Sequence, residues 1–384
     1  MAFVIFFSIV LTIYFLVNLY IYKHLLHFNL IGLQNVLFKI AFFTIVFAYP
    51  LGRVLERALP SLLSDLLVKM GSIWLGAMLY FTLFFLLIDL FRLISWVFSS
   101  PNILGFTVSK LLSSRVTFGI IGFVAIIIVA GYINALLPKV NRLSINTTKS
   151  ISGYKTLRVA MASDIHLGTV ISNGRLSRFV EMMNSQKPDI ILLAGDIFDE
   201  DIGPVIKRDM GSLISKLKAP LGIYAVTGNH EYIGGVEPAV NYLTQHGVTV
   251  IRDSVISPQN LFNIVGREDR QSKIMGGYSR KSITELASQI DKSKFTFLLD
   301  HQPYNLNEAV ENGIDFQLSG HTHHGQLWPF NFITQAIFEV SRGYKKIEQT
   351  HFFVSTGFGS WGPPIRIGNR PEIVVFEIVT SEKP

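Results

Sequence analysis

Long apolar runs without charge dominate the first third of the chain. Residues 3–22, 70–88 and 116–138 each lack Asp, Glu, Lys and Arg, and each is long enough to cross a ~30 Å hydrocarbon core as a helix. A fourth run, at about residues 36–51, is shorter and carries Lys39 near its start, which also fits a re-entrant or interfacial segment. The pattern therefore predicts about four transmembrane helices within residues 1–138.

The first apolar run has two interpretations, a secretory signal peptide and a membrane anchor. A signal peptide combines a basic start, an apolar region of about 7–15 residues and a small-residue cleavage site. Residues 1–22 contain no charged side chain, and no such site follows them. This pattern favours an anchor.

Charged residues are placed near the ends of the predicted spans. Asp89 and Arg92 close the run at 70–88, and Lys139 and Arg142 close the run at 116–138. Ionisable residues in the middle of a span would indicate an ion or substrate pathway. Their absence favours anchoring over a transporter or receptor.

From residue 157 onward the pattern changes to short apolar runs, each followed by a polar cluster. The runs occupy residues 157–163, 189–194, 222–227, 295–299 and 315–319. Each has the length of a buried strand bounded by turn residues, and segments of helical length, 174–186 and 204–217, separate the first three. This alternation predicts an α/β domain at residues 156–384. The polar, basic residues 139–155 predict a juxtamembrane linker.

The polar clusters contain residue types that bind metal ions. They are Asp164-Ile165-His166, Gly195-Asp196-Ile197-Phe198-Asp199, Gly228-Asn229-His230-Glu231, Asp300-His301 and Gly320-His321-Thr322-His323. Taken singly, the first three are compatible with tight turns or helix caps, and His301 with a hydrogen-bonded structural histidine. Ligands bind at the carboxyl ends of strands in α/β folds, and every cluster follows a predicted strand. The five together therefore indicate a metal site, and their carboxylate, imidazole and amide groups suit Mn, Zn, Fe or Co better than Ca.

Composition narrows the possible partners. Of 384 residues, 49% are hydrophobic and 16% charged, against roughly 25% charged in ordinary soluble domains. Residues 1–137 hold eight Lys and Arg against three Asp and Glu, and residues 138–384 hold 26 against 24. The net charge of +7 thus lies mainly beside the apolar runs, where anionic headgroups favour it, and nucleic-acid binding is not expected. The absence of cysteine excludes disulfides, thiolate metal ligands and cysteine nucleophiles.

Taken in order, the five clusters resemble the motif blocks of the calcineurin-like metallophosphoesterases. The resemblance covers about residues 155–380 and does not extend to the apolar helices. A closer likeness is to the membrane-associated branch that includes UDP-2,3-diacylglucosamine hydrolases. It rests on Gly320-His321-Thr322-His323-His324-Gly325-Gln326, on Gly359-Ser360-Trp361-Gly362-Pro363-Pro364-Ile365-Arg366 and on Pro371-Glu372-Ile373.

The resemblance implies a fold and a role for each residue. The fold is a four-layer β-sandwich flanked by helices. The first metal would be held by Asp164, His166 and His323, and the second by Asn229, His301 and His321. Asp196 would bridge both metals, and His230, oriented by Asp199, would protonate the leaving group. Two divalent ions are implied, with Mn expected and Zn, Fe or Co as alternatives.

Two further residues have open interpretations. Arg366 is a candidate phosphate clamp, because a guanidinium matches phosphate bidentately, or else forms a surface salt bridge. His324 stands where the branch usually has Gly, and it either contacts substrate or points to solvent. The apolar stretch between Gly325 and Lys346 is either a packed surface helix or a lip that contacts the bilayer or an acyl chain.

The expected function is a phosphodiesterase or pyrophosphatase that uses a water activated between the two ions on a membrane-associated or lipid-linked phosphoester. The alternative is a catalytically silent metal-binding scaffold or sensor in the membrane. A multi-pass protein of the cell membrane is expected. Charges that flank the spans lean slightly toward a cytoplasmic catalytic domain, and the oligomeric state is left open.

Overall fold

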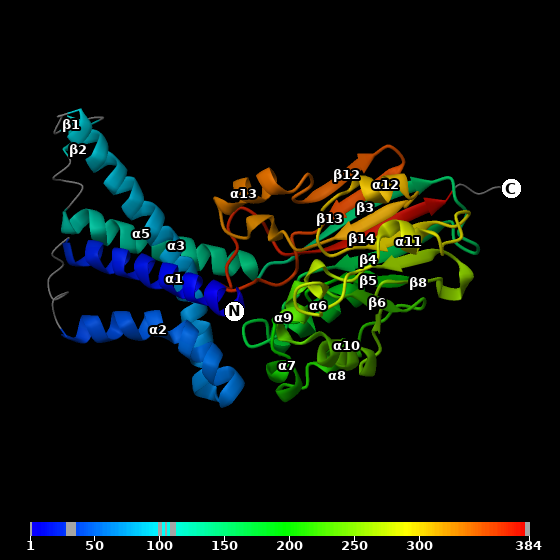
Figure 1. The fold of residues 1–384 in the computed structure, drawn as a ribbon, viewed down its shortest axis with the longest axis horizontal. Helices are drawn as coiled ribbons and strands as arrows, with labels where there is room; N and C mark the ends of the chain where they lie inside the picture. The colour runs from blue at the N-terminus through cyan, green and yellow to red at the C-terminus, as the bar shows by residue number, and fades with distance from the viewer. Residues whose placement is uncertain (1, 28–35, 99–101, 104–105, 108–112, 381–384) are drawn as a thin grey trace. The chain divides into compact units, whose positions relative to one another are not determined.

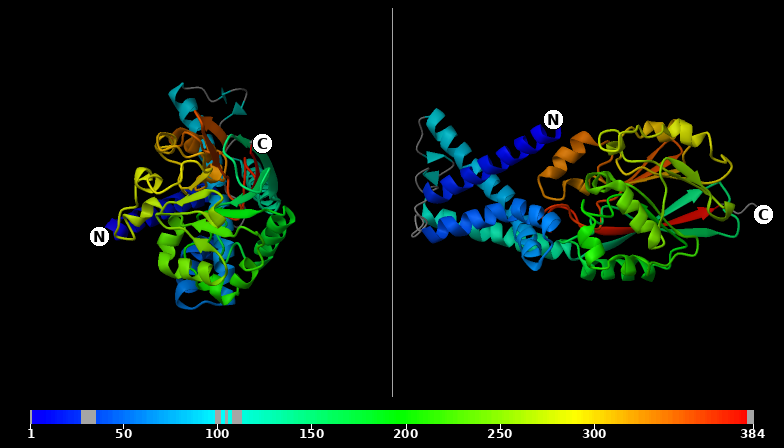
Figure 2. Two further views of the ribbon diagram at one scale, coloured as in Figure 1. Left: turned by 90° about the vertical axis from the view of Figure 1, so that its right-hand side faces the viewer. Right: turned by 60° about the horizontal axis from the view of Figure 1, so that its bottom comes forward.

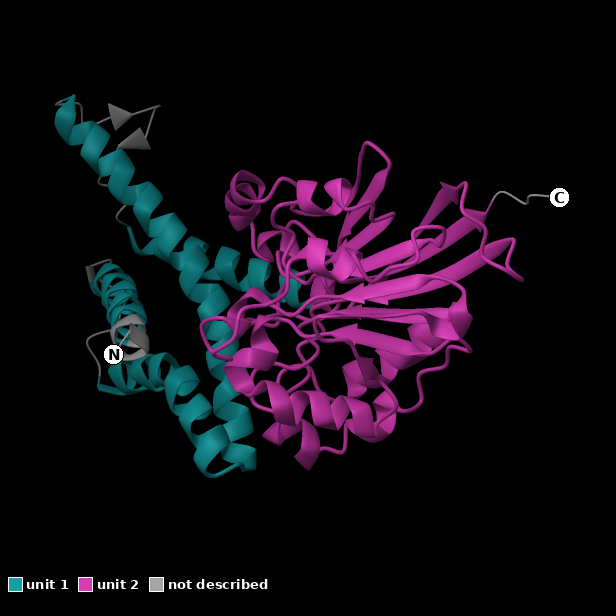
Figure 3. Ribbon diagram, turned by 45° about the vertical axis from the view of Figure 1, so that its right-hand side comes forward, with its two compact units in different colours: residues 1–132 teal, residues 133–384 magenta. Residues whose placement is uncertain are grey.

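The computed structural model describes residues 2–27, 36–98, 102–103, 106–107 and 113–380. The chain divides into two compact units, residues 1–132 and residues 133–384 (Figure 3). The boundary falls inside the last apolar helix, so the final turn of that helix belongs to the second unit.

The first unit contains four apolar helices, of which only the last extends into the second unit: α1 (Ala2–His27), α2 (Val36–Ala58), α3 (Leu62–Val97) and α5 (Ser114–Ala135). Each contains a stretch long and apolar enough to cross a membrane. The expected four spans are therefore confirmed within the described residues. Between α3 and α5, strands β1 (Asn102–Ile103) and β2 (Phe106–Thr107) pair antiparallel.

Helix α3 is longer than the sequence pattern predicts. It begins at a capping box formed by Ser61 and Ser64, and it continues through Asp89 and Arg92 to Val97, so these two residues do not end the helix. Its 36 residues extend roughly 54 Å at the α-helical rise, beyond a ~30 Å hydrocarbon core. Asp89 accepts a hydrogen bond from the Tyr20 hydroxyl at 2.8 Å and is paired with Arg92 at 3.0 Å. Helix length and paired charge together allow the Asp89 turn to lie outside the hydrocarbon.

Two six-stranded sheets form the framework of the second unit (Figure 1). Spatial order in the first sheet is β3 (Lys139–Thr147), β14 (Glu372–Thr380), β4 (Thr156–Ala162), β5 (Ile190–Ala194), β6 (Ile223–Val226) and β7 (Thr249–Val250). In the second sheet it is β12 (Gly343–Ile347), β13 (Thr350–Val354), β11 (Phe316–Ser319), β10 (Thr296–Leu299), β9 (Asn263–Gly266) and β8 (Ser254–Ile256). All five predicted strands are present, as β4, β5, β6, β10 and β11.

Both sheets are mixed, with parallel strands at their centres. Strands β4, β5, β6 and β7 are parallel, as are β9, β10, β11 and β13. Strand β14 is antiparallel to β4, and the edge strands β8 and β12 are antiparallel to their neighbours. Because the central strands of each sheet are parallel, their carboxyl ends share one edge of that sheet, and the polar clusters begin there.

The two sheets pack face to face and bury a shared core. Along β4, Val159 and Met161 point into this core, while Ala160 and Ala162 face the helices, as the period of two in a strand requires. On the outer face of the first sheet lie α6 (Asn173–Ser185), α7 (Gly203–Lys207), α8 (Gly211–Ile214) and α10 (Val236–Gln245), whereas α11 (Ile283–Ala287) and α12 (Asn307–Glu311) pack on the second (Figure 2). This arrangement is the expected four-layer fold.

Two predicted segments differ from the structure. Residues 204–217 form two short helices, α7 and α8, because Asp209 between them adopts a positive φ of 49° that no α-helix tolerates. Residues 139–147, predicted as a linker, form edge strand β3, which pairs with β14 along its whole length. The side chain of Ile145 enters the core between the sheets, so the folded domain begins before residue 156.

The last turn of α5 is hydrogen-bonded within the second unit. Asn134 Nδ2 donates to the carbonyls of Arg366 and Asn369 at 2.9 and 2.7 Å. The carbonyls of Ala135 and Leu136 accept from Arg175 and Arg178 at 2.8 and 2.7 Å. Carbonyls at a helix end have no partner within the helix, and here arginine side chains supply it.

Candidate metal centre

The five polar clusters follow the carboxyl ends of β4, β5, β6, β10 and β11, and several of their backbones are bent. Five candidate ligands have positive φ values: Asp164 (50°), His166 (51°), Asp196 (50°), His321 (70°) and His323 (44°). Residues other than glycine rarely adopt this conformation, which costs about 1–3 kcal/mol each. Such strain is typical of functional sites, where it aims side chains at a common point.

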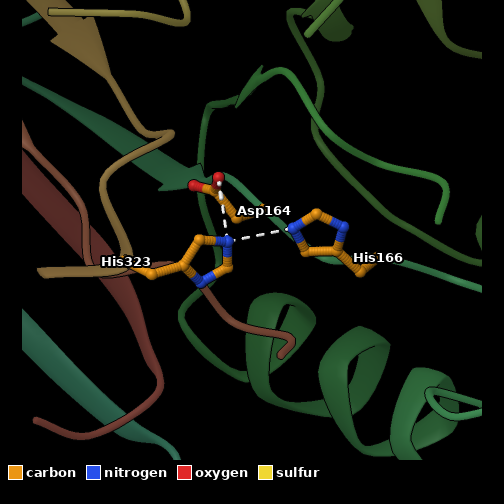
Figure 4. Close-up of side chains that lie close together, drawn as sticks. All are labelled: Asp164, His166 and His323. Carbon is orange, nitrogen blue, oxygen red and sulfur yellow. Dashed lines mark hydrogen bonds and ion pairs between the residues drawn. The ribbon is translucent and has the colours of Figure 1, made fainter. Parts of the chain in front are cut away.

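The first cluster of ligand atoms comprises Asp164, His166 and His323, whose side chains point toward one another (Figure 4). The two Nε2 atoms are 3.0 Å apart, and Asp164 Oδ1 lies 3.4 Å from His323 Nε2. All three side chains are buried. The structure therefore brings together the three residues expected to hold one ion.

The second cluster comprises Asp196, His301 and His321, joined by Asn229. Asp196 Oδ2 lies 3.1 Å from His301 Nε2, and His321 Nδ1 lies 2.8 Å from Asn229 Oδ1. Asn229 is the first residue of helix α9 (Asn229–Gly234) rather than part of a tight turn. The helix start holds the Asn229 amide within reach of the imidazoles.

Asp196 lies between the two clusters. Its Oδ2 atom is 3.1 Å from His301 Nε2 and 4.0 Å from His166 Nε2, and its Oδ1 accepts the backbone N–H of His230 at 2.9 Å. Burial alone would raise the pKa of this carboxyl, but the neighbouring His301 and His230 imidazoles hold it well below its usual range. One carboxylate oxygen thus faces nitrogen ligands of both clusters.

The buried nitrogen atoms of this site fit divalent metal ions. His301 Nδ1 donates to the carbonyl of Ala194 at 2.7 Å, which leaves Nε2 as the nitrogen that faces Asp196, and that carboxylate outweighs burial and raises the pKa of His301 well above its usual value. His301 Nε2 is buried without a hydrogen bond, and such an orphaned polar atom is costly unless it binds something. Burial lowers the pKa of His321 to about 3, and burial with the nearby His166 and Arg366 lowers that of His323 far below its usual value. Neutral imidazoles are the form that coordinates metals.

His230 lies beside both clusters. Its ring is 4.6 Å from that of His166, centroid to centroid. Burial opposes its protonation, but Asp196 and Asp199 outweigh burial and raise its pKa. Asp199 Oδ1 lies 3.7 Å from His230 Nδ1 and 3.8 Å from His166 Nδ1. Both distances exceed a hydrogen bond, so Asp199 is placed between two imidazoles rather than bonded to His230.

Arg366 does not lie as a phosphate clamp or a surface salt bridge would. Its side chain is fully buried, and its guanidinium donates to the carbonyls of Gly359 and Thr356 at 2.6 Å each and to Asn369 Oδ1 at 2.8 Å. It also lies 3.1 Å from His323 Nδ1. The sequence pattern could not show this, because burial of the 356–369 loop depends on contacts made across the fold. Arg366 holds this loop against a metal-ligand histidine.

His324 does not point to solvent, because its side chain is 3% exposed. Its Nδ1 lies 3.0 Å from the Ser341 hydroxyl, and its φ is 46°. The loop that carries His323 therefore turns inward at His324.

The apolar stretch between Gly325 and Lys346 contains helix α13 (Phe330–Ile337), none of whose eight residues is buried. Both interpretations of this stretch place it at the surface, and α13 lies there. A helix that only packs against the domain would bury its apolar side chains. The interpretation as a packed surface helix therefore does not explain why these side chains are exposed.

Glu231 is a functional residue whose role the sequence analysis left unassigned. Its buried carboxylate accepts the backbone N–H groups of Asp196, Ile197, Phe198 and Gly228 at 2.7–3.1 Å. It thereby fixes the loop after β5 to the start of α9, and with it Asp196 to Asn229. A signal was present: Glu three residues after the Gly228 N-cap is half of a capping box.

Fold and ligand atoms define a metal-binding α/β domain joined to apolar, membrane-spanning helices. A family model of the calcineurin-like phosphoesterases matches residues 157–325. The chain is 32% identical over 260 residues to an uncharacterized metallophosphoesterase of Aquifex aeolicus, covering 67% of this chain and 98% of that protein. It is 29% identical over 390 residues to one of Campylobacter jejuni, covering 98% and 99%.

A third relative, from Danio rerio, bears the name transmembrane protein with metallophosphoesterase domain. It is 31% identical over 261 residues, which cover 65% of this chain and 59% of that protein. With these similarities and the four apolar helices, the chain belongs to the calcineurin-like metallophosphoesterase family and is a phosphoesterase hydrolase of the membrane.

Proposed function

We propose that this chain is a two-metal phosphodiesterase or pyrophosphatase that acts on a membrane-associated, lipid-linked phosphoester. The observation that carries the proposal is the position of Asp196 Oδ2, within 4.0 Å of nitrogen ligands from both clusters. A bridging carboxylate offsets the repulsion of two nearby cations, which is what a dinuclear centre requires.

Each ligand has a role in this proposal. Asp164, His166 and His323 would hold one divalent ion, and Asn229, His301 and His321 would hold the other, while Asp196 would serve both. Mn²⁺ is the preferred candidate, with Zn, Fe or Co as alternatives. Such ions, when bound, supply an activated water and neutralise charge on the phosphoryl oxygens. Glu231 and Arg366 hold the backbone of the ligand loops in place.

His230 is the proposed general acid. Its raised pKa, caused by Asp196 and Asp199 against the effect of burial, favours the protonated imidazolium that a leaving alkoxide needs. A small movement of the Asp199 side chain would close the 3.7 Å separation to a hydrogen bond and fix the imidazole orientation. The ring of Trp361, 6.1 Å from that of His230, covers the edge of this acid.

The membrane-linked substrate rests on the helices and on family likeness. Four apolar helices keep the domain at a bilayer, and the tail from Gly359 to Arg366 resembles the branch that includes UDP-2,3-diacylglucosamine hydrolases. We also propose a cell-membrane location, and the slight excess of Arg and Lys that flank the spans on one side supports a cytoplasmic catalytic domain.

Hydrolysis of chromogenic esters tests the proposal directly. The purified full-length protein would be assayed against a phosphodiester and a phosphomonoester, metal-free and with Mn²⁺ restored, beside Asp196→Asn and His230→Ala. We expect metal-dependent turnover that both substitutions abolish. Metal binding without turnover of either ester, or of extracted membrane lipids, would support the silent scaffold instead.

A further inference from the structure

The metal-site histidines are joined to an exposed apolar surface by one short segment of chain. We define the α13 surface as Trp328, Phe330, Phe332, Ile333 and Ile337 together with Trp361. Their exposed fractions are 41–60%. Phe330, Ile333 and Ile337 recur at i, i+3 and i+7, which places them on one face of the helix. The eight residues of α13 include no charged side chain.

Both ends of this segment are fixed at the metal centre. Before the helix, the backbone of Gln326 follows the ligand His323, and the Gln326 side chain is hydrogen-bonded to the backbone of Trp361. After the helix, the ring of Phe338 packs edge-on against that of the ligand His321, with centroids 6.0 Å apart. The segment leaves the ligand loop, presents α13 outward and returns to the same loop.

The same segment is tied to the end of the last apolar helix. Trp328 N–H donates to the carbonyl of Ile367 and Ile367 N–H to that of Gln326, each at 2.9 Å. The flanking carbonyls of Arg366 and Asn369 accept from Asn134 in the final turn of α5. Only one loop therefore separates the start of the α13 surface from the point at which an apolar, spanning-length helix ends. All of these contacts lie within the second unit.

We propose that the α13 surface lies in the headgroup and acyl boundary of the bilayer that α5 crosses. An exposed apolar helix face flanked by tryptophan is typical of interfacial segments. The chain between α13 and β13 holds Arg342, Lys345 and Lys346 against Glu339 and Glu348, a net charge of +1, which suits anionic headgroups.

A consequence follows that rests on the proposed function. Since Trp361 packs against His230 and α13 returns to His321, the reacting phosphate would be bound at the level of the lipid headgroups. A phosphoester carried by a lipid would reach the metal centre without leaving the membrane.

The absence of cysteine allows a direct test by single-site labelling. Ile333→Cys and Ile206→Cys are matched, because both isoleucines are 54% exposed and lie in the second unit. Each full-length variant would carry an environment-sensitive fluorophore and be reconstituted in vesicles of phosphatidylcholine and phosphatidylglycerol. We expect the label at position 333 to shift to the blue and to lose intensity with doxyl-labelled lipids but not with iodide. The label at position 206 should respond in the opposite way.

Quenching of the label at 333 by iodide, or by neither agent, would overturn the proposal; the second result would mean that protein covers the surface. Retained metal content would show that each labelled variant is folded. Because quenching requires no turnover, an inactive protein with a lipid-quenched label would refute the proposed function and leave the interfacial surface standing.

Discussion

The two clusters of the candidate centre differ in the group that contacts the outer ring nitrogen, Nδ1, of a ligand histidine. In the second cluster, His301 Nδ1 donates to the Ala194 carbonyl, so Nε2 is the nitrogen that faces the site. In the first cluster, His323 Nδ1 faces the guanidinium of Arg366 at 3.1 Å. A guanidinium only donates hydrogen bonds, so this contact requires the His323 proton on Nε2, the atom that must bind an ion.

Clustered ligands are therefore not equally prepared to bind metal. In the second cluster, the hydrogen bond from His301 Nδ1 to a backbone carbonyl leaves Nε2 as the nitrogen that can bind an ion, although Asp196 raises the pKa of this imidazole and an ion must displace the Nε2 proton. In the first cluster, an ion must also loosen the contact between His323 Nδ1 and a buried cation. Outer hydrogen bonds of this kind change metal affinity by about 10–100-fold. We therefore expect the second cluster to bind its ion more tightly.

Substitution of Asp196 should have the largest effect, because both clusters depend on this residue. Asp196 is the only carboxylate among the described ligands that faces both clusters, and Asp196→Asn removes the charge that offsets two cations. We expect kcat to fall at least about a thousandfold, because several kcal/mol of charge stabilisation are lost, and bound metal to fall below one equivalent. Turnover of a chromogenic phosphodiester and elemental analysis of the purified protein would measure both.

The matched control for that variant is Asp291→Asn, which changes the same group on a half-exposed side chain far from the site. It should keep full activity and metal. An Asp196→Asn protein that retains two equivalents of metal would refute the bridging role.

Substitution of His230 should lower the rate of hydrolysis without changing metal binding in either cluster. His230→Ala removes the proposed acid but no metal ligand, so metal content should stay unchanged while kcat falls about 10²–10⁴-fold. A substrate with a good leaving group, such as a nitrophenyl ester, should lose less than an alkyl ester, since it needs no proton. His351→Ala serves as control, because it removes an imidazole outside the site, on β13, that is hydrogen-bonded to Tyr344 of the edge strand β12. An equal loss for both leaving groups would argue against acid catalysis.

Metal titration tests whether the two clusters differ in metal affinity. Calorimetry on the metal-stripped full-length protein should show two binding phases separated by about 10–100-fold in affinity. His323→Ala should keep the tighter phase, and His321→Ala should abolish it. Two equal phases in the wild type, or the reverse assignment in the variants, would show that the contacts behind His301 and His323 do not control affinity.

Most of the fold was predictable because its signals are local. Strands β4, β5 and β6 are short apolar runs bounded by turns, and their type and position follow from the sequence. The sequence of strand β3 predicts a linker, because an edge strand with half-exposed, polar positions has the composition of a loop. Its assignment depends on pairing with β14, more than 200 residues away in sequence, and no local pattern reveals such a partner.

The candidate site divides in the same way. Ligands such as Asp164 and His321 were predicted because carboxylates and imidazoles that follow parallel strands converge on one edge. The motif around Arg366 does not show whether the side chain faces the substrate or the protein interior, because that depends on contacts made across the fold. The outer contacts of His301 and His323 are formed by a backbone carbonyl and by a buried loop. No sequence pattern predicts either contact.

Substitution of Asn134, which lies outside the site, should have the smallest effect and should act on one cluster. Asn134 is the helix α5 residue that holds the carbonyls of Arg366 and Asn369, and both of these residues contact His323. Asn134→Ala removes two hydrogen bonds worth about 0.5–1.5 kcal/mol each, so we expect the weaker metal phase to weaken by about three- to tenfold and the tighter phase to stay unchanged. Asn184→Ala, which removes a similar bond to the Lys216 carbonyl, is the control and should alter neither phase. Equal weakening of both phases would mean that α5 supports the whole domain, whereas a selective change would show that the end of a membrane helix adjusts one half of the metal centre.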